Sequence, residues 1–217
     1  MLRFVASVLI VSGVLMLADA GLTVAWQEPV SAFMASRDQG DLEDELTSGQ
    51  SAADRDKQLT ASIRDVERRI RRLAGLAERR AKDGKAVGRI EIPSLDRDYV
   101  FVEGTSLEPL RKGPGHYPET SFPGQGGTVA IAGHRTTYGA PFRTIDKLKK
   151  GQRILLRMPY GTLEYEVEKT QIVNPDATWV TDRVKGAERL VLSACHPLYS
   201  AAQRIVVFAR LTGARID

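Results

Sequence analysis

The sequence of 217 residues contains one cysteine and three histidines, and it has neither internal repeats nor low-complexity tracts. A single cysteine excludes an intramolecular disulfide, so packing alone must hold the fold together. No C-x-x-C or H-x-x-x-H pair occurs, which makes a zinc site built from His116, His134, Cys195 and His196 the least favoured option. With 42% hydrophobic and 27% charged residues, the composition predicts a globular core rather than a disordered chain.

Positive charge is concentrated in one segment. The chain carries a net charge of +4, whereas residues 64–85 alone hold nine lysines and arginines against four acidic residues. Because this excess is larger than that of the whole chain, the basic character says nothing about the domain that follows, and we expect no nucleic-acid partner. A solvated helix face is the simpler interpretation, and contact with anionic lipid headgroups or envelope polymers is the alternative.

The N-terminus is dominated by a nearly uninterrupted apolar run over residues 4–26. Its length suits one membrane crossing, which takes about 20 residues. Arg3 precedes the run and no further basic residue occurs before Arg37, so the N-terminus is expected in the cytoplasm and the remainder on the extracellular face. Residues 1–26 are therefore predicted to be a cytoplasmic N-terminus with a single-pass transmembrane anchor. The alternative is a signal peptide cut after the A-x-A pattern of residues 18–20.

Two segments separate this run from the remainder of the chain. Residues 27–58 are polar and rich in acidic side chains without an apolar period, which predicts a linker. Residues 59–84 are predicted to form a basic amphipathic helix that acts as a stalk. Its apolar seam spans under three heptads, too short for a lasting coiled coil, and consists of Leu59, Ile63, Val66, Ile70, Leu73 and Ala77.

Residues 85–217 have the pattern of a β-domain. Seven stretches are short, rich in β-branched residues and bounded by Gly, Pro, Asn or Asp: VGRIEIPSL, DYVFVEG, GGTVAIAGHR, QRILLRM, GTLEYEVEKTQIV, ERLVLSAC and QRIVVFARL. One of them, TLEYEVEKTQIV, alternates apolar and polar residues as a half-buried strand should. Only PFRTIDKLKKG favours a helix. Seven or eight strands in this segment predict a single all-β sandwich or barrel.

Three chemically reactive or charged residues lie at the ends of separate apolar strands. Cys195 follows RLVLSA, and an exported protein rarely keeps an unpaired thiol without a use for it. A cysteine nucleophile acts as its thiolate and needs a positive charge nearby. His134 ends the strand GGTVAIAGHR and is the preferred base, whereas His196 should face away from Cys195 and His116 lies on a loop. Arg204 opens the last strand, from which its guanidinium could stabilise the thiolate and an oxyanion.

Residues 87–211 resemble a sortase, the cysteine transpeptidase of Gram-positive envelopes. The AGHR strand end, the cysteine ending the penultimate strand and the arginine opening the final strand match the family's His, Cys and Arg in order and spacing. The segments GPGHYP, HRTTYGAPF and CHP followed by QR are most similar to the class E sortases of high-GC actinobacteria. The resemblance implies a closed eight-stranded β-barrel with short helices, a membrane anchor, and a catalytic site of His134, Cys195 and Arg204.

The resemblance also implies a reaction. A surface protein carrying a C-terminal Leu-Pro-x-Thr-Gly or Leu-Ala-x-Thr-Gly sorting signal would be cut between Thr and Gly, held as a thioester, and transferred to an amine of a peptidoglycan precursor or a pilin. No metal or organic cofactor is needed for any step. Tyr117, Tyr138 and Ala194 are expected to contact the substrate, with Tyr117 at its second residue.

One departure concerns the family's T-L-x-T-C signature, because VLSAC puts Val191 and Ala194 where both threonines stand. Ala194 keeps the backbone N–H but lacks the hydroxyl, so weaker transition-state stabilisation or an altered substrate preference is expected. Two alternatives stay open. One is another exported Cys–His peptidase or transpeptidase that does not require Arg204. The other is a membrane-tethered, non-catalytic β-domain that binds an envelope partner and keeps Cys195 as an inert, buried thiol.

Overall fold

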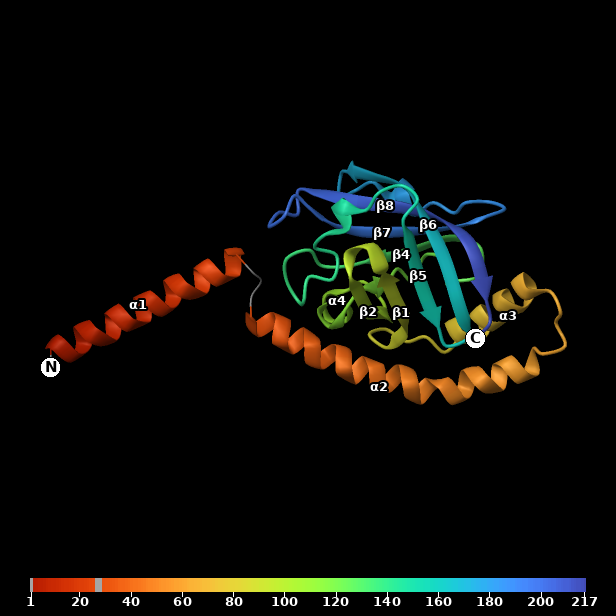
Figure 1. The fold of residues 1–217 in the computed structure, drawn as a ribbon, viewed down its shortest axis with the longest axis horizontal. Coiled ribbons are helices and arrows are strands. Elements are labelled where there is room, and N and C mark those ends of the chain that lie inside the picture. The colour runs from red at the N-terminus through yellow and green to blue at the C-terminus, as the bar shows by residue number, and fades with distance from the viewer. Residues whose placement is uncertain (1, 26–28) are drawn as a thin grey trace.

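The computed structural model describes residues 2–25 and 29–217, and within them eight strands close into one barrel (Figure 1). Around the barrel the strands follow the order β1-β2-β3-β4-β7-β8-β6-β5. The strands are β1 (Ala86–Ile92), β2 (Arg97–Glu103), β3 (Gly115–His116), β4 (Gly127–Ala132), β5 (Arg153–Met158), β6 (Gly161–Val173), β7 (Glu188–His196) and β8 (Gln203–Arg215). The closed eight-stranded β-barrel expected from the sequence is confirmed.

The seven β-branched stretches recognised in the sequence all form strands, and the additional strand, β3, is only two residues long. Short helical segments join them: η1 (Pro93–Leu95), α4 (Leu107–Lys112), η2 (Ile145–Lys147) and η3 (Thr178–Thr181). The predicted helix PFRTIDKLKKG is limited to the single turn η2. Strand boundaries were predictable because Gly and Pro punctuate the strands closely.

Strand β7 is apolar on both faces because both faces are covered. Leu192 and Ala194 pack into the barrel interior. Val191 packs on the opposite face, in a smaller cluster with Phe208 of β8 and Val180 of η3. This double burial explains why RLVLSAC reads as a continuous apolar run instead of an alternating one.

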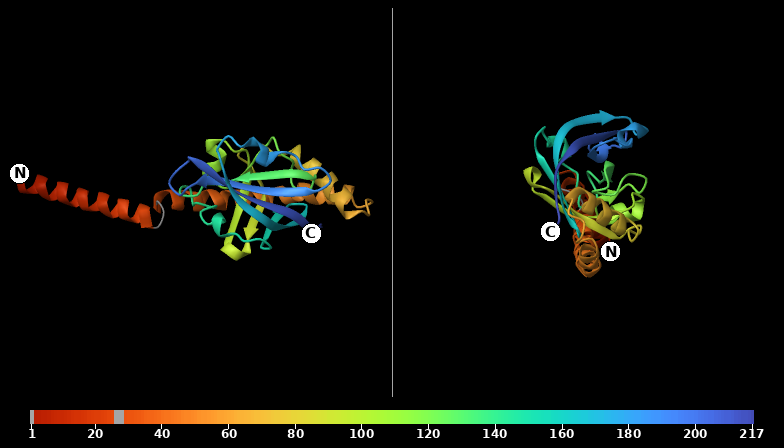
Figure 2. Two further views of the ribbon diagram at one scale, coloured as in Figure 1. Left: turned by 90° about the horizontal axis from the view of Figure 1, so that it is seen from above. Right: turned by 90° about the vertical axis from the view of Figure 1, so that its right-hand side faces the viewer.

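The predicted linker is wrong for most of its length, because a helix, α2 (Pro29–Leu59), runs along the outside of the barrel wall (Figure 2). Gln39 takes the place of a neighbouring strand for β2: its Oε1 accepts from the Val100 N–H at 2.8 Å, and its Nε2 donates to the Val100 carbonyl at 3.0 Å. Leu42 packs on Val100 and Val102. The sequence pattern missed this helix because its docking depends on the amides of Gln39 and Gln50 and on a few small or isolated apolar residues, which leave no clear apolar period.

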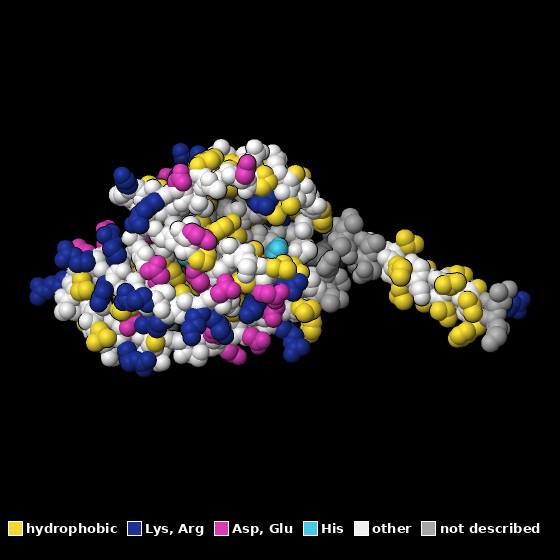
Figure 3. Space-filling view, turned by 180° about the vertical axis from the view of Figure 1, so that it is seen from behind, with side chains coloured by type: hydrophobic (Ala, Val, Ile, Leu, Met, Phe, Trp, Pro, Cys, Tyr) yellow, Lys and Arg dark blue, Asp and Glu magenta, His cyan; other side chains and the backbone are white. Residues whose placement is uncertain are grey.

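The predicted stalk of residues 59–84 is helical only over α3 (Val66–Glu78), because Leu59 ends α2 and residues 60–65 are not helical. Helix α3 packs against the barrel and does not act as a spacer. Ile70, Leu73 and Ala74 belong to the same buried cluster as the barrel interior. Its first turn is capped by Asp65, whose side chain accepts a hydrogen bond from the Arg68 N–H at 2.7 Å. The basic residues of α3 face outward, and lysines and arginines gather at this end of the molecule, away from α1 (Figure 3).

The predicted seam contains two leucines that the structure buries to very different extents, Leu73 in α3 and Leu59 at the end of α2. Leu73 is 1% exposed, whereas Leu59 is 79% exposed. Leu73→Ala should therefore lower the free energy of unfolding by about 2–4 kcal/mol, because it leaves a cavity in the core. Leu59→Ala is the matched control and should change it by less than about 0.5 kcal/mol. Urea unfolding of both variants measures this, and equal losses would contradict the packing of α3 on the barrel.

A helix, α1 (Leu2–Ala25), forms where the sequence predicted the membrane anchor. Within the residues that the structure describes, none of the helices is both long and apolar enough to cross a membrane, so the predicted transmembrane span is not supported. Residues 26–28, where the predicted anchor passes into the predicted linker, lie outside the described residues.

Candidate active site

Strands β4, β7 and β8 are neighbours in the barrel, and His134, Cys195 and Arg204 lie at their ends or just past them. Strand β7 lies between β4 and β8 in the barrel. In the antiparallel pair of β7 and β8, Cys195 stands directly opposite Arg204, so both side chains share one face of the sheet. In the parallel pair of β4 and β7, the last register pair is Ala132 with Ser193, and His134 follows two residues later, past the end of β4.

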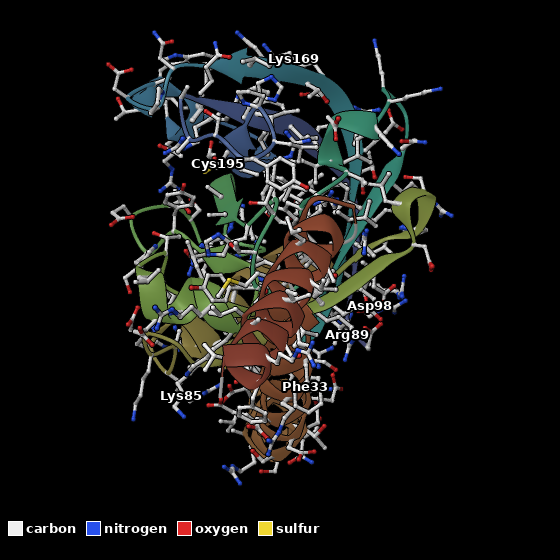
Figure 4. The ribbon with its side chains drawn as sticks, turned by 90° about the vertical axis from the view of Figure 1, so that its left-hand side faces the viewer. Phe33, Lys85, Arg89, Asp98, Lys169 and Cys195 are labelled. Atoms are coloured by element: carbon white, nitrogen blue, oxygen red, sulfur yellow. The ribbon has the colours of Figure 1, made fainter. Side chains whose placement is uncertain are left out.

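The thiol of Cys195 lies at the end of β7 and is partly exposed (Figure 4). It is the only cysteine of the chain and forms no disulfide. The alternative of a fully buried thiol gains no support, because Cys195 is a partly exposed residue near the end of a strand.

The glycine just before His134 leaves room for the ring of Phe142. The Gly133 N–H donates to the Ser193 carbonyl at 3.0 Å, which continues the β4–β7 ladder by one bond. A Cβ at Gly133 would lie 2.5 Å from the ring of Phe142, so a side chain there would displace that ring. The Phe142 N–H in turn donates to the His134 carbonyl at 3.0 Å. The backbone of His134 is thus held from both sides.

The imidazole of His134 is half-buried and packs against Tyr138, with ring centroids 5.0 Å apart. Its Nε2 is buried and makes no hydrogen bond within the described residues. Burial lowers the pKa of His134 below its ordinary value of 6.5, because desolvation disfavours the imidazolium. The ring therefore carries a buried nitrogen without a hydrogen-bond partner among the described residues.

The lowered pKa of His134 predicts a stability change below neutral pH. The unfolded chain binds this proton more tightly than the folded protein does, so the free energy of unfolding should fall as pH drops from about 6.5 through the lower pKa of the folded state. His134→Gln should lack this part of the acid loss. Urea unfolding of both proteins at pH 7.5 and pH 5 measures it, because all other titrating groups are common to the pair. An identical pH dependence would contradict the prediction.

Arg204 begins β8 and its guanidinium orders the loop between β7 and β8. Nη1 donates to the carbonyls of Ala201 at 3.0 Å and Gln203 at 2.9 Å. These two bonds hold one edge of the planar guanidinium, and the remaining N–H groups are available to a ligand near Cys195.

A groove with a volume of about 320 Å³ leads along the outer face of β7 to Arg204. Tyr117 lines this groove, as does Ser193, two residues before Cys195 on the same face of the strand. Its apolar walls come from Val180 of η3 and Val206 of β8.

The structure separates the other predicted substrate contacts. The side chain of Ala194 is 4% exposed and points into the barrel interior, on the face opposite to Cys195, so Ser193 and not Ala194 lines the groove. The alternation of side chains along a strand was the signal that identifies Ser193. Tyr138 does not line the groove; it lies against His134 and beside the Arg111 guanidinium, 5.7 Å from the Tyr138 ring centroid.

The remaining histidines have other partners. His116 is 1% exposed, with Nδ1 3.0 Å from a Glu103 carboxylate oxygen and Nε2 3.1 Å from the Ser121 carbonyl, so it holds the loop before β4. His196 has Nδ1 3.2 Å from an Arg135 nitrogen. Among the described residues, His, Cys, Asp and Glu side chains form no group of three or more that could hold a metal ion, so the zinc alternative gains no support.

Known proteins resemble the chain in sequence and in fold. The sortase domain family matches residues 90–212. Sortase D of Bacillus subtilis is 35% identical over 58% of this chain, and sortase SrtE1 of Streptomyces coelicolor is 26% identical over 98% of it. These matches cover 64% and 58% of the two relatives, so the chain spans less than two thirds of their length.

A solved sortase structure resembles this chain in fold. Sortase E from Streptomyces avermitilis superposes with a TM-score of 0.58 and 31% identity, covering 62% of this chain and 93% of that one. From the family match over more than half of its length, this chain belongs to the sortase family.

Proposed function

We propose that this protein is a cysteine transpeptidase that cleaves a C-terminal sorting signal between Thr and Gly and transfers the product to an amine. The observation that carries the proposal is the register of Cys195 opposite Arg204 on β7 and β8, with His134 two residues past the end of the neighbouring strand β4. A base, a partly exposed nucleophile and a guanidinium on one face are the parts that acyl transfer through a thioester requires.

The first half-reaction forms the acyl-enzyme. The Cys195 thiol gives its proton to His134, the resulting thiolate attacks the carbonyl carbon of the Thr, and the carbonyl oxygen becomes an oxyanion. N–H groups of Arg204 that do not hold the loop donate to this oxyanion. The tetrahedral intermediate collapses with loss of the Gly amine, which takes a proton from the His134 imidazolium. The product is a thioester between Cys195 and the Thr carbonyl.

The second half-reaction consumes the thioester. An acceptor amine gives up a proton to neutral His134, attacks the thioester carbon and releases the Cys195 thiolate. Because burial lowers the pKa of His134, the neutral form that this step needs is well populated at neutral pH. An amine of a peptidoglycan precursor or a pilin lysine is the proposed acceptor, which implies action on the outer face of the cell envelope.

The groove along β7 supports the choice of substrate. Its walls of Val180, Val191 and Val206 suit the apolar Leu and Pro, or Leu and Ala, at the start of the signal. Tyr117 is proposed to contact the second residue, and Ser193 and Arg204 line the same groove. We therefore propose Leu-Pro-x-Thr-Gly or Leu-Ala-x-Thr-Gly as the sorting signal.

Mass spectrometry of the full chain tests this function. The protein is incubated with each of the two peptides and with a scrambled peptide as the control, first without and then with an added amine. We expect a covalent adduct on Cys195 that carries the peptide up to Thr, and its transfer to the amine. Absence of both adduct and transfer with either signal peptide would refute the proposed reaction.

A further inference from the structure

Arg135, the residue after His134, has no assigned role and has an unusual environment. It is 3% exposed, yet its guanidinium must stay charged. Burying a guanidinium costs free energy unless its N–H groups find acceptors. The position and identity of those acceptors therefore show what this side chain holds in place.

The acceptors lie on two segments that flank the thiol. Nε and Nη2 donate to the Arg143 carbonyl at 3.3 and 3.1 Å, and Nη2 lies 3.0 Å from a carboxylate oxygen of Asp146. Nη1 faces the end of β7 instead: it lies 3.2 Å from His196 Nδ1 and 3.5 Å from the carbonyl oxygen of Cys195. One buried side chain thus joins the segment after β4 to the backbone of the proposed nucleophile.

The contact also fixes the histidine beside the nucleophile. Arginine only donates hydrogen bonds, so His196 Nδ1 must be the acceptor and its ring proton must be on Nε2. A second contact joins the same two loops, because Arg143 Nη2 donates to the Tyr199 hydroxyl at 3.2 Å. The segments that follow His134 and Cys195 are therefore tied together on the side away from the groove.

We propose that Arg135 is a positioning residue for the acyl transfer proposed above, and that it sets the separation of the His134 imidazole and the Cys195 thiol. It does so because it follows His134 directly in the chain and binds the carbonyl of Cys195 and the ring of His196. This inference rests on the proposed function. It adds a residue that touches neither substrate nor the reacting atoms.

Two substitutions test this role. Arg135→Gln removes the charge and the fork, and Arg135→Lys keeps the charge but cannot hold the Arg143 carbonyl and the end of β7 at once. We expect kcat to fall about 100-fold in both, because a shift of about 1 Å between reacting groups costs that much. KM for the peptide should stay within about threefold, since the groove residues are untouched.

A matched control separates positioning from a general loss of stability. Arg89 is a partly buried arginine that binds Asp98 at 2.6 Å and also pairs with Glu43 of α2, away from Cys195 (Figure 4). Arg89→Gln should lower the urea midpoint but leave kcat unchanged. A further readout is the double variant of Arg135→Lys with His196→Gln, whose combined loss in kcat should be smaller than the product of the single losses.

The possible results distinguish this role from the reaction itself. Wild-type protein that forms no acyl-enzyme would contradict the proposed function, and this role with it. Wild-type transfer together with a kcat within threefold in folded Arg135→Lys would overturn the role of Arg135 alone. If Arg135→Gln does not fold, the kcat of Arg135→Lys alone tests the positioning role. A fall in kcat with an unchanged KM in the Arg135 variants, and an unchanged kcat in Arg89→Gln, supports the positioning role.

Discussion

Replacing Cys195 with serine should abolish peptide cleavage and transfer, with a loss on the order of 10⁴-fold or more. The hydroxyl is nearly the size of the thiol, but it is a far weaker nucleophile at neutral pH. The oxyanion and base contributions of Arg204 and His134 would stay in place, so the loss measures the sulfur itself. The assay is the transfer of a signal peptide to an added amine, followed by mass.

The fold should survive this substitution, because Cys195 is partly exposed at the end of β7. We expect the free energy of unfolding to change by less than about 0.5 kcal/mol. Since the chain has only this cysteine, alkylation of the wild-type protein modifies one site and should give the same loss of activity. Cleavage by the serine variant at more than a few per cent of the wild-type rate would remove Cys195 as the nucleophile.

Replacing Arg204 with lysine should lower kcat by about 10²–10³-fold, the usual cost of losing one oxyanion donor. The charge is kept, so this variant tests geometry. The guanidinium holds the carbonyls of Ala201 and Gln203 with one nitrogen and leaves others for a ligand. A lysine ammonium is a single point on a flexible chain and cannot satisfy the loop and the oxyanion together.

Arg210 offers the matched control on the same strand. It is exposed, pairs with Glu166 at 2.8 Å and faces neither the groove nor the thiol. Arg210→Lys should leave kcat within about twofold of wild type. If Arg204→Lys behaves as Arg210→Lys does, the oxyanion role is lost, and the result instead favours a Cys–His peptidase that needs no arginine.

The helices around the barrel explain why part of the fold could not be read from the sequence. The seam of α3 was visible as a period, but whether it packs on a second helix or on a barrel depends on which surface is nearby. Here Ile70 and Leu73 of α3 pack against the barrel core. In α2 there was no period to read, because Gln39 and Leu42 dock it at isolated points. Both predictions for residues 27–84 therefore needed correction. Residues 29–58 form a helix and not a linker, and the helix of the predicted stalk packs on the barrel and is not a spacer.

The candidate site, like the fold, could be predicted from the sequence only in part. The sequence indicated His134, Cys195 and Arg204, because each ends or begins an apolar strand and the family motif gives their order. Their adjacency depends on the order β4-β7-β8 and on the Cys195–Arg204 register, which no local pattern contains. The inward direction of Ala194 and the buried contacts of Arg135 likewise became visible only in the folded chain.

The sequence by itself determined where seven of the eight strands of residues 85–217 lie, which residues bring reactive or charged groups to strand ends, and which family the motif resembles. These features are local, because side-chain period, Gly and Pro punctuation and motif spacing extend over a few residues. Only the tertiary structure decided which strands are neighbours, which side chains share the groove, and that α2 and α3 cover the barrel. These features depend on burial and hydrogen bonding between segments that are far apart in the chain. Such contacts contribute to the free energy of folding only once the segments have packed together.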